Sequence, residues 1–528
     1  MTTRPEAGPG PSPGGTSAAA RVGAGIFFSR VFGFVRDRVV AHYFGSSDFA
    51  DAWRAGLRIP NVVQNLLGEG TLSASLIPVY AEMIEEGREE DAARFAGAAL
   101  GILTAVAGAL ALLGWLLAPW LVALFFWAWD EGKQALTVTL VRILFPMTGV
   151  LVLSAWALGI LNSHRRFFVS YCAPVVWNLA MITAVIGGAV YFGLGAQSRD
   201  LLLALAWGAL AGGFLQLGFQ VPFLLRYVRG MRVSLGRGVA GVDEAVTNFW
   251  PVVAARGVVN VSGWVDMFLA GWLRNGALAV MGYAQTIYVL PISLFGMSVA
   301  ASELPELSRM RGEGERVISA RVAGALRRVM YFLVPSTLAC LVLGDVLVAA
   351  LYETGEFGVA QSLVTWGVLA GYALGLPASA SSRLLSSAFY ALRDTKTPAR
   401  IAYLRVAVSA GVGIALMFPA DRFGFSTLRL GAAGLALGST AGAWLEYAML
   451  RRALGRRIGP HGPGPGPVAR VALAATLATA VAVAVQLLIP PAHPLVIALE
   501  TLLPFGVVYL AVAALLGERI ELRRSART

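Results

Sequence analysis

Charged residues are scarce in this sequence, and their scarcity limits the class of protein that it can encode. They make up 14% of its 528 residues, whereas about 25% is usual in soluble globular proteins. The mean hydropathy is high, at +0.69. Segments such as 95–126 and 471–489 are apolar over the roughly 20 residues that a helix needs to cross the hydrocarbon core of a bilayer. The sequence therefore indicates an all-α polytopic membrane protein rather than a soluble one.

Cysteine and histidine are also rare, which restricts the chemistry open to the chain. Cys172 and Cys340 lie far apart in apolar segments, so they form no disulfide framework and no metal-binding pattern. The histidines are scattered, and no Ser/His/Asp arrangement stands out. The phosphate-binding pattern GxxxxGK[ST] is missing as well. The sequence thus predicts neither an enzyme nor a nucleotide or metal cofactor.

The charge that is present is mostly positive, with a formal net charge of +12. In a soluble protein this would suggest a nucleic-acid partner. Here the arginines lie mainly in short loops between apolar runs, where they set membrane topology. We therefore expect no nucleic-acid partner. Residues 1–17 are rich in proline and glycine, which predicts a disordered N-terminal tail.

The apolar runs and the helix breakers between them predict about fourteen transmembrane helices. The second and eighth contain internal glycine or proline, so we expect them to be bent or broken. The predicted spans are 18–43, 49–83, 93–126, 136–162, 168–193, 200–227, 244–273, 277–308, 320–351, 361–392, 398–419, 429–452, 468–489 and 495–516.

Basic residues recur in alternate loops, and this pattern predicts the orientation of the chain. With the N-terminus in the cytoplasm, the inside loops include 163–167, 226–238 and 393–400, which are rich in arginine or lysine. The outside loops include 129–133 and 352–358, which hold few basic residues. Because Lys and Arg in short loops favour the cytoplasmic side, both termini are predicted to be cytoplasmic.

The first twelve spans fall into two similar halves, each with two prolines in its second span. A parallel repeat of this kind is used by transporters that rock two helix bundles about a central site. The alternative is a chance likeness between two polytopic halves. The predicted domains are the tail 1–17, an N-lobe 18–230, a C-lobe 240–455, a helix pair 466–517 and a basic tail 518–528.

Ionisable residues gather in the first two spans, where each would cost roughly 2.5–3.5 kcal/mol at the bilayer centre. Arginines outnumber carboxylates among them. A positive, partly desolvated cavity suits an anionic substrate, and the planar fork of arginine suits phosphate. The alternative is that the arginines neutralise the acidic residues and hold the two helices together. The cluster consists of Arg30, Arg36, Asp37, Arg38, Asp51, Arg54, Arg58 and Glu69.

The second half of the chain has fewer such residues. Arg256 and Asp266 lie in the seventh span and Arg405 in the eleventh. Asp266 could bind a coupling cation, carry a proton or pair with an arginine such as Arg405, and the sequence leaves these roles open.

Six segments stand out as family motifs, namely FSRVFGFVRDRVVAHYFG (28–45), DAWRAGLRIPN (51–61), GEGTLSASLIPVYAE (68–82), LFPMTGVLVLSAWALGILNSHRRF (144–167), APVVWNLAMI (173–182) and AFYALRDTKTP (388–398). They resemble the MurJ (MviN) family of lipid II flippases, in the multidrug/oligosaccharidyl-lipid/polysaccharide (MOP) exporter superfamily. The resemblance covers about residues 20–515. It implies two six-helix lobes and a C-terminal helix pair that forms a groove for a lipid tail. It also implies alternating access and lipid II, an undecaprenyl-diphosphate-linked disaccharide-pentapeptide, as the substrate.

The resemblance assigns roles to individual residues. Arg30 and Arg36 match the two arginines of the family's first helix, and Arg58 its basic residue before "PN". These three are implied to bind the diphosphate, while Asp51 orients or gates them. Glu69 matches the glutamate of the family's "EG" motif.

The chain departs from the family pattern at two places. Gln64 and Asn65 stand where many members carry arginine, and "YADR" becomes "YAQT" with Gln285 and Thr286. Arg54, Arg58 or Arg256 could supply the missing charge. Asp266 lies near an aspartate that helps to bind sodium in some members, but the other ligands do not align. Coupling to sodium, protons or the membrane potential therefore remains open.

These observations predict a flippase, not an enzyme, that acts as a monomer in the bacterial cytoplasmic (inner) membrane. It would move the peptidoglycan precursor lipid II from the cytoplasmic to the outer leaflet among membrane lipids. One alternative is a related exporter of another polyprenyl-diphosphate-linked glycan or of drugs, which the departures at Gln64 and Thr286 would support. Another is a non-transporting membrane scaffold, against which the charges of Arg30, Arg36, Asp51 and Arg58 argue.

Overall fold

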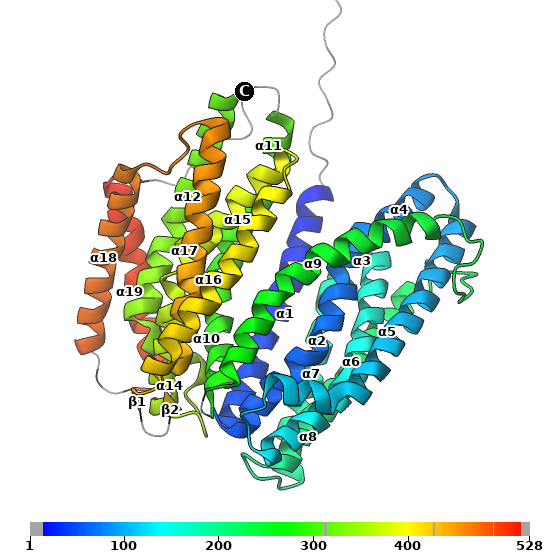
Figure 1. The fold of residues 1–528 in the computed structure, drawn as a ribbon, viewed down its shortest axis with the longest axis horizontal. Helices are drawn as coiled ribbons and strands as arrows, with labels where there is room; N and C mark the ends of the chain where they lie inside the picture. Colours follow the sequence, from blue (N-terminus) through cyan, green and yellow to red (C-terminus); the bar gives the residue numbers. More distant parts are fainter. Residues whose placement is uncertain are drawn as a thin grey trace, which may run out of the picture. The chain divides into compact units, whose positions relative to one another are not determined.

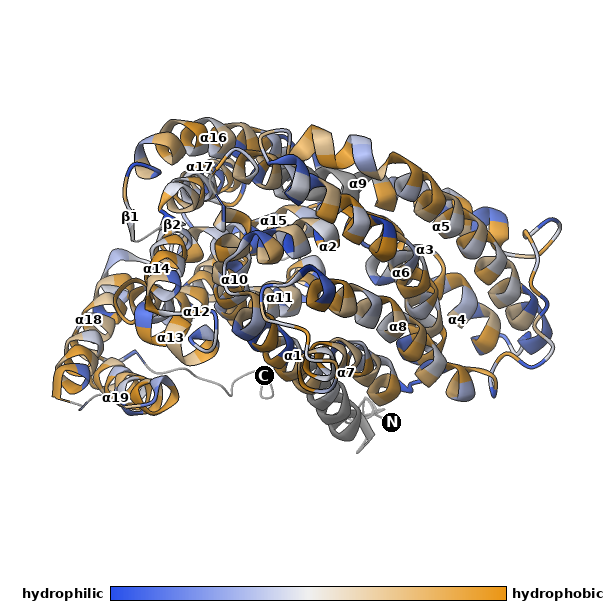
Figure 2. Ribbon diagram, turned by 90° about the horizontal axis from the view of Figure 1, so that it is seen from below, coloured by the Kyte–Doolittle hydropathy of each residue, from blue (hydrophilic) through white to orange (hydrophobic). Residues whose placement is uncertain are grey.

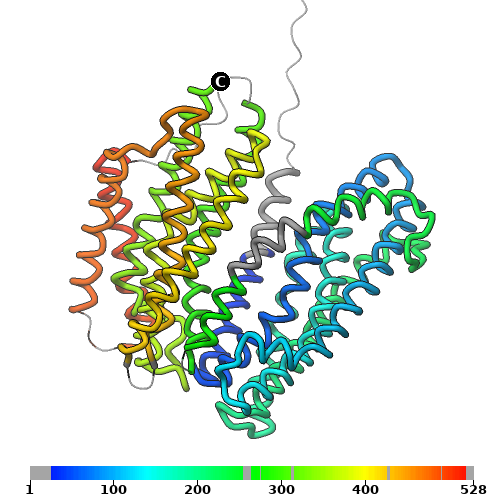
Figure 3. Tube along the Cα trace, in the orientation of Figure 1, coloured from blue at the N-terminus to red at the C-terminus, as the bar shows by residue number. Residues whose placement is uncertain are grey.

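A computed structural model describes residues 14–273, 275–310, 314–425, 428–488, 490 and 492–518. Nearly all of them are helical, and the chain can be followed in Figure 1 and Figure 3. Residues 1–13 and 519–528, which make up most of the two predicted tails, lie outside the described part. Residues 14–17 belong to the first helix, because the small residues that follow them continue it without a break.

The chain up to residue 270 forms α1 (Gly14–Phe44), α2 (Asp48–Leu67), α3 (Glu69–Ser75), α4 (Ile77–Glu85), α5 (Glu89–Phe125), α6 (Glu131–Ser163), α7 (Phe167–Tyr191), α8 (Arg199–Leu224) and α9 (Val242–Ala270). From residue 277 onwards it forms α10 (Ala277–Pro291), a π-helical turn η1 (Ile292–Gly296), α11 (Met297–Arg309), α12 (Glu315–Val342), α13 (Gly344–Tyr352), α14 (Val359–Ala373), α15 (Leu376–Ala391), α16 (Lys396–Ala420), α17 (Gly431–Ile458), α18 (Pro465–Leu488) and α19 (Pro494–Leu515). A two-residue hairpin, β1 (Gly424–Phe425) and β2 (Leu428–Arg429), joins α16 to α17.

The chain folds into two compact units. Unit 1 comprises Met1–Val40 and Ala52–Trp264, and unit 2 comprises Ala41–Asp51 and Val265–Thr528. The division falls inside α9, whereas the sequence places it between residues 230 and 240. The reason is that the first half of α9, with Val242 and Ala245, packs in the same apolar core as α5.

Each predicted span coincides with helix, but several are interrupted. The second span is broken on both sides of α3, as expected. The eighth runs as one continuous helix that contains the π-helical turn η1, so its expected bend stays a prediction. The ninth and tenth spans are also broken, between α12 and α13 and between α14 and α15, and the second of these breaks bends the chain by 41°. At both breaks a glycine packs too closely for a side chain. A Cβ on Gly344 would lie 2.5 Å from Trp366, and one on Gly375 would lie 2.7 Å from Thr440.

Among the described residues, nine helices are long and apolar enough to cross a membrane, or ten if the bent pair α14–α15 is one span. The predicted all-α polytopic fold is therefore confirmed, while the total of about fourteen spans stays a prediction. Figure 2 shows apolar residues along most of α18 and α19. The nine helices are α5, α6, α7, α8, the continuous α10–η1–α11, α12, α16, α18 and α19.

In unit 1, small residues bring α7 and α8 close together. A Cβ on Gly208 would lie 2.4 Å from the Cβ of Ala184, so only glycine permits this approach. The indole of Trp177 donates a hydrogen bond to the carbonyl oxygen of Ala209 on α8, at 3.0 Å. This packing fixes Trp177 and its neighbour Asn178 in α7.

In unit 2, the last helices pack on α12. The hydroxyl of Tyr509 on α19 donates to the carbonyl oxygen of Tyr331. Beyond α19, the Glu518 carboxylate is 2.6 Å from Arg327 on α12 and 2.7 Å from Arg470 on α18. Burial raises the pKa of Glu518, but the hydrogen bonds and charges of the two arginines outweigh it and lower the pKa overall. The predicted helix pair 466–517 is thus held by a charged residue at its end.

Candidate functional site

Arg36 is the most firmly held of the predicted arginines in unit 1. Its guanidinium donates to Asp37 Oδ1 at 2.8 Å and to Asn178 Oδ1 at 3.1 Å. The guanidinium carbon also lies 5.6 Å from the ring centroid of Trp177, a geometry that favours cation–π attraction. The Arg36 side chain keeps 17% of its surface exposed, while the Asp37 side chain keeps 6%. The arginine is therefore oriented by three neighbours and retains an accessible face.

Arg54 and Arg58 follow on α2. Arg54 Nη2 lies 3.8 Å from Asp37 Oδ2, so Asp37 is shared between arginines of two helices. The Arg58 guanidinium lies against α9, where a Cβ on Gly263 would be 2.8 Å from its Nη2. Unit 1 thus brings Arg36 and Arg54 together, and it places Arg58 beside backbone without a side chain.

Asp51 belongs to unit 2, although it lies one turn from Arg54 along α2. Its carboxylate accepts hydrogen bonds from the backbone N–H of Gly276 at 2.7 Å and of Ala279 at 2.8 Å. It therefore satisfies backbone donors at the start of α10, as an N-cap side chain does. Asp51 is only 1% exposed. The sequence predicted that Asp51 orients or gates the arginines, and that role stays a prediction. The contacts with Gly276 and Ala279 are structural.

The structure describes the side chains of two of the three remaining predicted site residues. Arg30 on α1 and Glu69 at the start of α3 are both exposed. The side chain of Arg256 lies outside the described part of the chain.

Asp266 and Arg405 are the predicted ion-coupling or salt-bridge residues, and both lie in unit 2. Arg405 on α16 pairs with Glu446 on α17 at 2.7 Å, whereas a pair between Arg405 and Asp266 stays a prediction. Asp266 is half-buried in the last part of α9. Among the described residues, no three His, Cys, Asp or Glu side chains are grouped so that they could hold a metal ion.

At one of the two departures from the family pattern, Gln285 and Thr286 form hydrogen bonds with uncharged groups. The Gln285 amide donates to the Tyr372 hydroxyl at 2.9 Å. The Thr286 hydroxyl donates to the Gly282 carbonyl within its own helix at 2.9 Å. These contacts use the polarity of the two residues but supply no positive charge.

Sequence reasoning did not single out Asn178 and Trp177, which orient Arg36. The signal was an asparagine inside the apolar segment VVWNLAM, where a polar residue needs a partner. It also missed that Glu303 on α11, 4% exposed, pairs with both Arg321 and Arg328 on α12.

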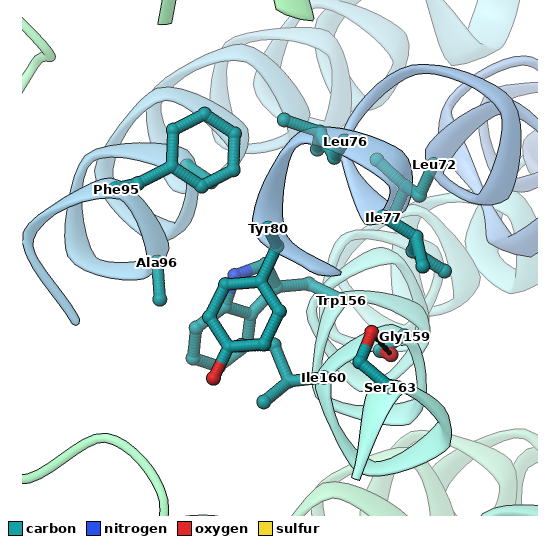
Figure 4. Close-up of a pocket in the computed structure, with 11 residues that line it drawn as sticks. Leu72, Leu76, Ile77, Tyr80, Phe95, Ala96, Trp156, Gly159, Ile160 and Ser163 are labelled. Atoms are coloured by element: carbon teal, nitrogen blue, oxygen red, sulfur yellow. Dashed lines mark hydrogen bonds between the residues drawn. The ribbon is translucent and has the colours of Figure 1, made fainter. Parts of the chain in front are cut away.

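A small cavity in unit 1 lies between α3, α4, α5 and α6 (Figure 4). Its volume of about 20 Å³ is enough for about one water molecule, so it is no substrate site. The Tyr80 hydroxyl at this cavity is 3.0 Å from His164 Nε2 in the turn after α6. Burial lowers the pKa of His164, although Glu89 acts in the opposite direction.

A sequence model described as lipid II flippase MurJ matches residues 40–492. The chain belongs to the MurJ family. A probable lipid II flippase MurJ of Rhizobium tropici is 32% identical to it, over 83% of this chain and 80% of that protein. The lipid II flippase MurJ of Burkholderia cenocepacia is 29% identical, over 81% of each chain. The family resemblance predicted from the motifs is thereby confirmed.

Solved structures agree on the fold of this MurJ family member. A lipid II flippase MurJ in an inward closed conformation matches with a TM-score of 0.75 and 21% identity, covering 94% of this chain and 98% of that one. An inward-facing multidrug resistance MATE family transporter of the MOP superfamily matches with a TM-score of 0.65 and 16% identity, covering 84% and 98%. At these identities the likeness establishes the fold, which is that of MOP transporters.

Proposed function

We propose that this protein is a lipid II flippase that carries the undecaprenyl-diphosphate-linked precursor across the cytoplasmic membrane by alternating access. Family membership over most of the chain and the MOP transporter fold support this proposal. A transporter of this kind breaks no bond, in keeping with the absence of an enzyme motif in the sequence.

The observation that carries the proposal is the orientation of Arg36. A guanidinium offers five donors. Asp37 and Asn178 accept from all three of its nitrogens, yet one face of the side chain stays accessible. A guanidinium held in a fixed orientation suits a diphosphate better than a neutral or cationic substrate. The positive charge of the first helix acts in the same direction. Arg30 and Arg58 would complete the contacts, with Arg54 and Arg256 as further candidates.

The test is complementation in cells whose own lipid II flippase is depleted. Arg36→Ala should abolish growth, because losing one charge-assisted hydrogen bond costs about 1.5–3 kcal/mol, or about ten- to a hundredfold in affinity. Arg36→Lys should restore only part of it, since lysine has no fork. Arg30→Ala should also fail, while Arg199→Ala, exposed at the start of α8, should grow normally. All variants must reach the membrane in equal amounts.

Depleted cells should accumulate lipid II, and the wild-type chain should reverse that accumulation. Growth without any change in lipid II would instead indicate an exporter of another polyprenyl-diphosphate-linked glycan or of drugs. Full complementation by both Arg30→Ala and Arg36→Ala would show that these arginines of the first helix do not bind the diphosphate.

We further propose that the protein acts as a monomer with both termini in the cytoplasm, and that the membrane potential helps to reset the empty positive cavity. The potential is worth about 2.3 kcal/mol per charge per 100 mV. Coupling through sodium or protons at Asp266 is the alternative, and Asp266→Asn should then make transport independent of that ion's gradient.

A further inference from the structure

A second cavity in unit 1 is larger and almost entirely apolar. Its volume is about 390 Å³, and an apolar cavity of about 150 Å³ is already enough to bind benzene. Three of its lining residues are exposed at the surface, namely Val106, Val246 and Trp250, at 40%, 41% and 65%. The cavity lies between the end of α2, the first half of α5 and the start of α9, and its deeper wall includes Leu67, Phe95 and Leu103.

The loop between α8 and α9 borders this cavity and is fixed to α5. The Ser234 N–H points to the Gly97 carbonyl oxygen at 3.5 Å. Cβ atoms on Gly97 and Gly101 would lie only 2.2 and 2.1 Å from carbonyl oxygens of the loop, so these glycines make its close approach possible. Gly236 then packs on Ile102 and Val242, which both line the cavity.

The same loop presents arginine and apolar side chains together. Val233 and Leu235 are 63% and 66% exposed. The loop's arginines, Arg226, Arg229, Arg232 and Arg237, are also exposed. Exposed apolar residues between arginines are suited to the membrane interface, where the former enter the acyl region and the latter meet phosphates.

Acidic residues also lie at this end of unit 1, in the turn before α5, whereas the loop between α8 and α9 contains none. Residues 226–244 contain four arginines and two acidic residues, Asp243 and Glu244, so their formal charge is +2. In the acidic turn 82–94, Glu86 pairs with Arg88 and Glu90 with Arg94, and four further carboxylates leave the turn with a formal charge of −4. The loop is therefore the positive element beside the cavity.

We propose that the cavity holds an acyl chain of an anionic phospholipid whose phosphate is bound by Arg232 and Arg237. The charge of the loop selects an anionic headgroup, and the apolar lining accepts the chain. The bound lipid joins α2, α5 and α9, which otherwise leave an apolar gap in unit 1. The site is separate from the cluster around Arg36, and it needs no assumption about the transported substrate.

The test is the thermal unfolding of the purified full chain in a neutral detergent, with native mass spectrometry of retained lipid. Phosphatidylglycerol should raise the melting temperature by several degrees, and phosphatidylcholine and glycerol phosphate should do so by much less. In the variant Arg232→Ser/Arg237→Ser the shift should fall by at least half, while Arg199→Ser should behave as wild type. Val246→Trp, which fills the cavity from its rim, should abolish retention of the lipid.

Equal shifts with phosphatidylcholine, or an unchanged shift in the double arginine variant, would overturn the proposal. Displacement of phosphatidylglycerol by undecaprenyl phosphate at the same site would overturn it too, because the occupant would then be the substrate's own tail. Arg232 and Arg237 lie on an exposed loop, so we expect the double arginine variant to fold. The test therefore remains decisive even if Val246→Trp does not fold. Neither measurement requires transport.

Discussion

At the scale of single residues, charges that are close in sequence serve different purposes. Asp37 lies in unit 1 between Arg36 and Arg54, where it orients guanidinium groups. Asp51 lies in unit 2 and binds backbone amides of Gly276 and Ala279. Burying an aspartate without hydrogen-bond partners costs free energy. Guanidinium groups stabilise Asp37, and backbone N–H groups stabilise Asp51.

Replacing Asp51 tests its structural contact. Asp51→Ala leaves two buried N–H groups without their acceptor, and an unsatisfied buried donor costs about 1–3 kcal/mol. The melting temperature of the purified Asp51→Ala protein should fall by several degrees. Asp51→Asn keeps one acceptor, so its melting temperature should fall less. Asp48→Ala on the same helix should have a smaller effect, because its bond to Asn275 is exposed. If Asp51→Ala melts like the wild type but fails to complement, the carboxylate acts on the substrate or the arginines instead.

At the scale of elements, the contact between α16 and α17 depends on glycine. Gly434, Gly438 and Gly442 recur every four residues along one side of α17, the small-xxx-small spacing that lets membrane helices approach closely. A Cβ on Gly438 would lie 2.5 Å from the backbone nitrogen of Gly413 on α16. The backbones themselves are in contact, so no side-chain movement can make room.

Gly438→Leu should therefore separate α16 from α17. Overpacking a core costs typically about 1–3 kcal/mol, and a clash with backbone belongs at the upper end. We expect a lower melting temperature and loss of the monodisperse peak in size-exclusion chromatography. Gly411→Leu on α16 is the matched control, because a Cβ there meets no atom within 4 Å. Equal behaviour of the two variants would show that the close contact contributes little to stability.

At a connection between elements, Asp394 caps the start of α16. The backbone N–H of Thr397 donates to its Oδ1 at 2.9 Å, and Arg457 pairs with its Oδ2 at 2.5 Å. The hydrogen bonds from Thr397, followed by the charge of Arg457, lower the pKa of Asp394 despite burial. Such a carboxylate stabilises the fold above its unfolded-state pKa, and the contribution is lost as the pH falls through its lower folded-state pKa.

At the scale of the whole molecule, the alternation of loop charge predicts the orientation of every helix. The loops 226–238 and 393–400 are basic, whereas 129–133 and 352–358 are not. Because one extra or missing span would swap all later loops, orientation measured at several loops also tests the count of spans.

Thiol labelling with a membrane-impermeant reagent measures this orientation. In a background of Cys172→Ser and Cys340→Ala, the variants Glu131→Cys and Glu356→Cys should react in spheroplasts. Arg229→Cys and Lys396→Cys should react only after the membrane is opened. All four positions are exposed, so lack of reaction would reflect sidedness rather than burial. Reaction of Lys396→Cys in intact spheroplasts would contradict the predicted topology.

The sequence by itself determined the class of fold, the family and the residues that carry charge into the membrane. Long apolar runs can only be satisfied as helices in lipid, and short motifs are local, so both can be read along the chain. The breaks beside α3 were predictable for the same reason, since glycine and proline act locally.

Only the tertiary structure decided which charges meet. Arg36 with Asn178, Asp51 with α10, and Arg405 with Glu446 are contacts between residues 41 to 228 positions apart, and spacing along one helix says nothing about them. The close approaches of Gly344 to Trp366 and of Gly375 to Thr440 are likewise contacts between different helices. Helix periodicity fixes which face a residue occupies, but its partner is set by the packing of helices that are distant in the chain.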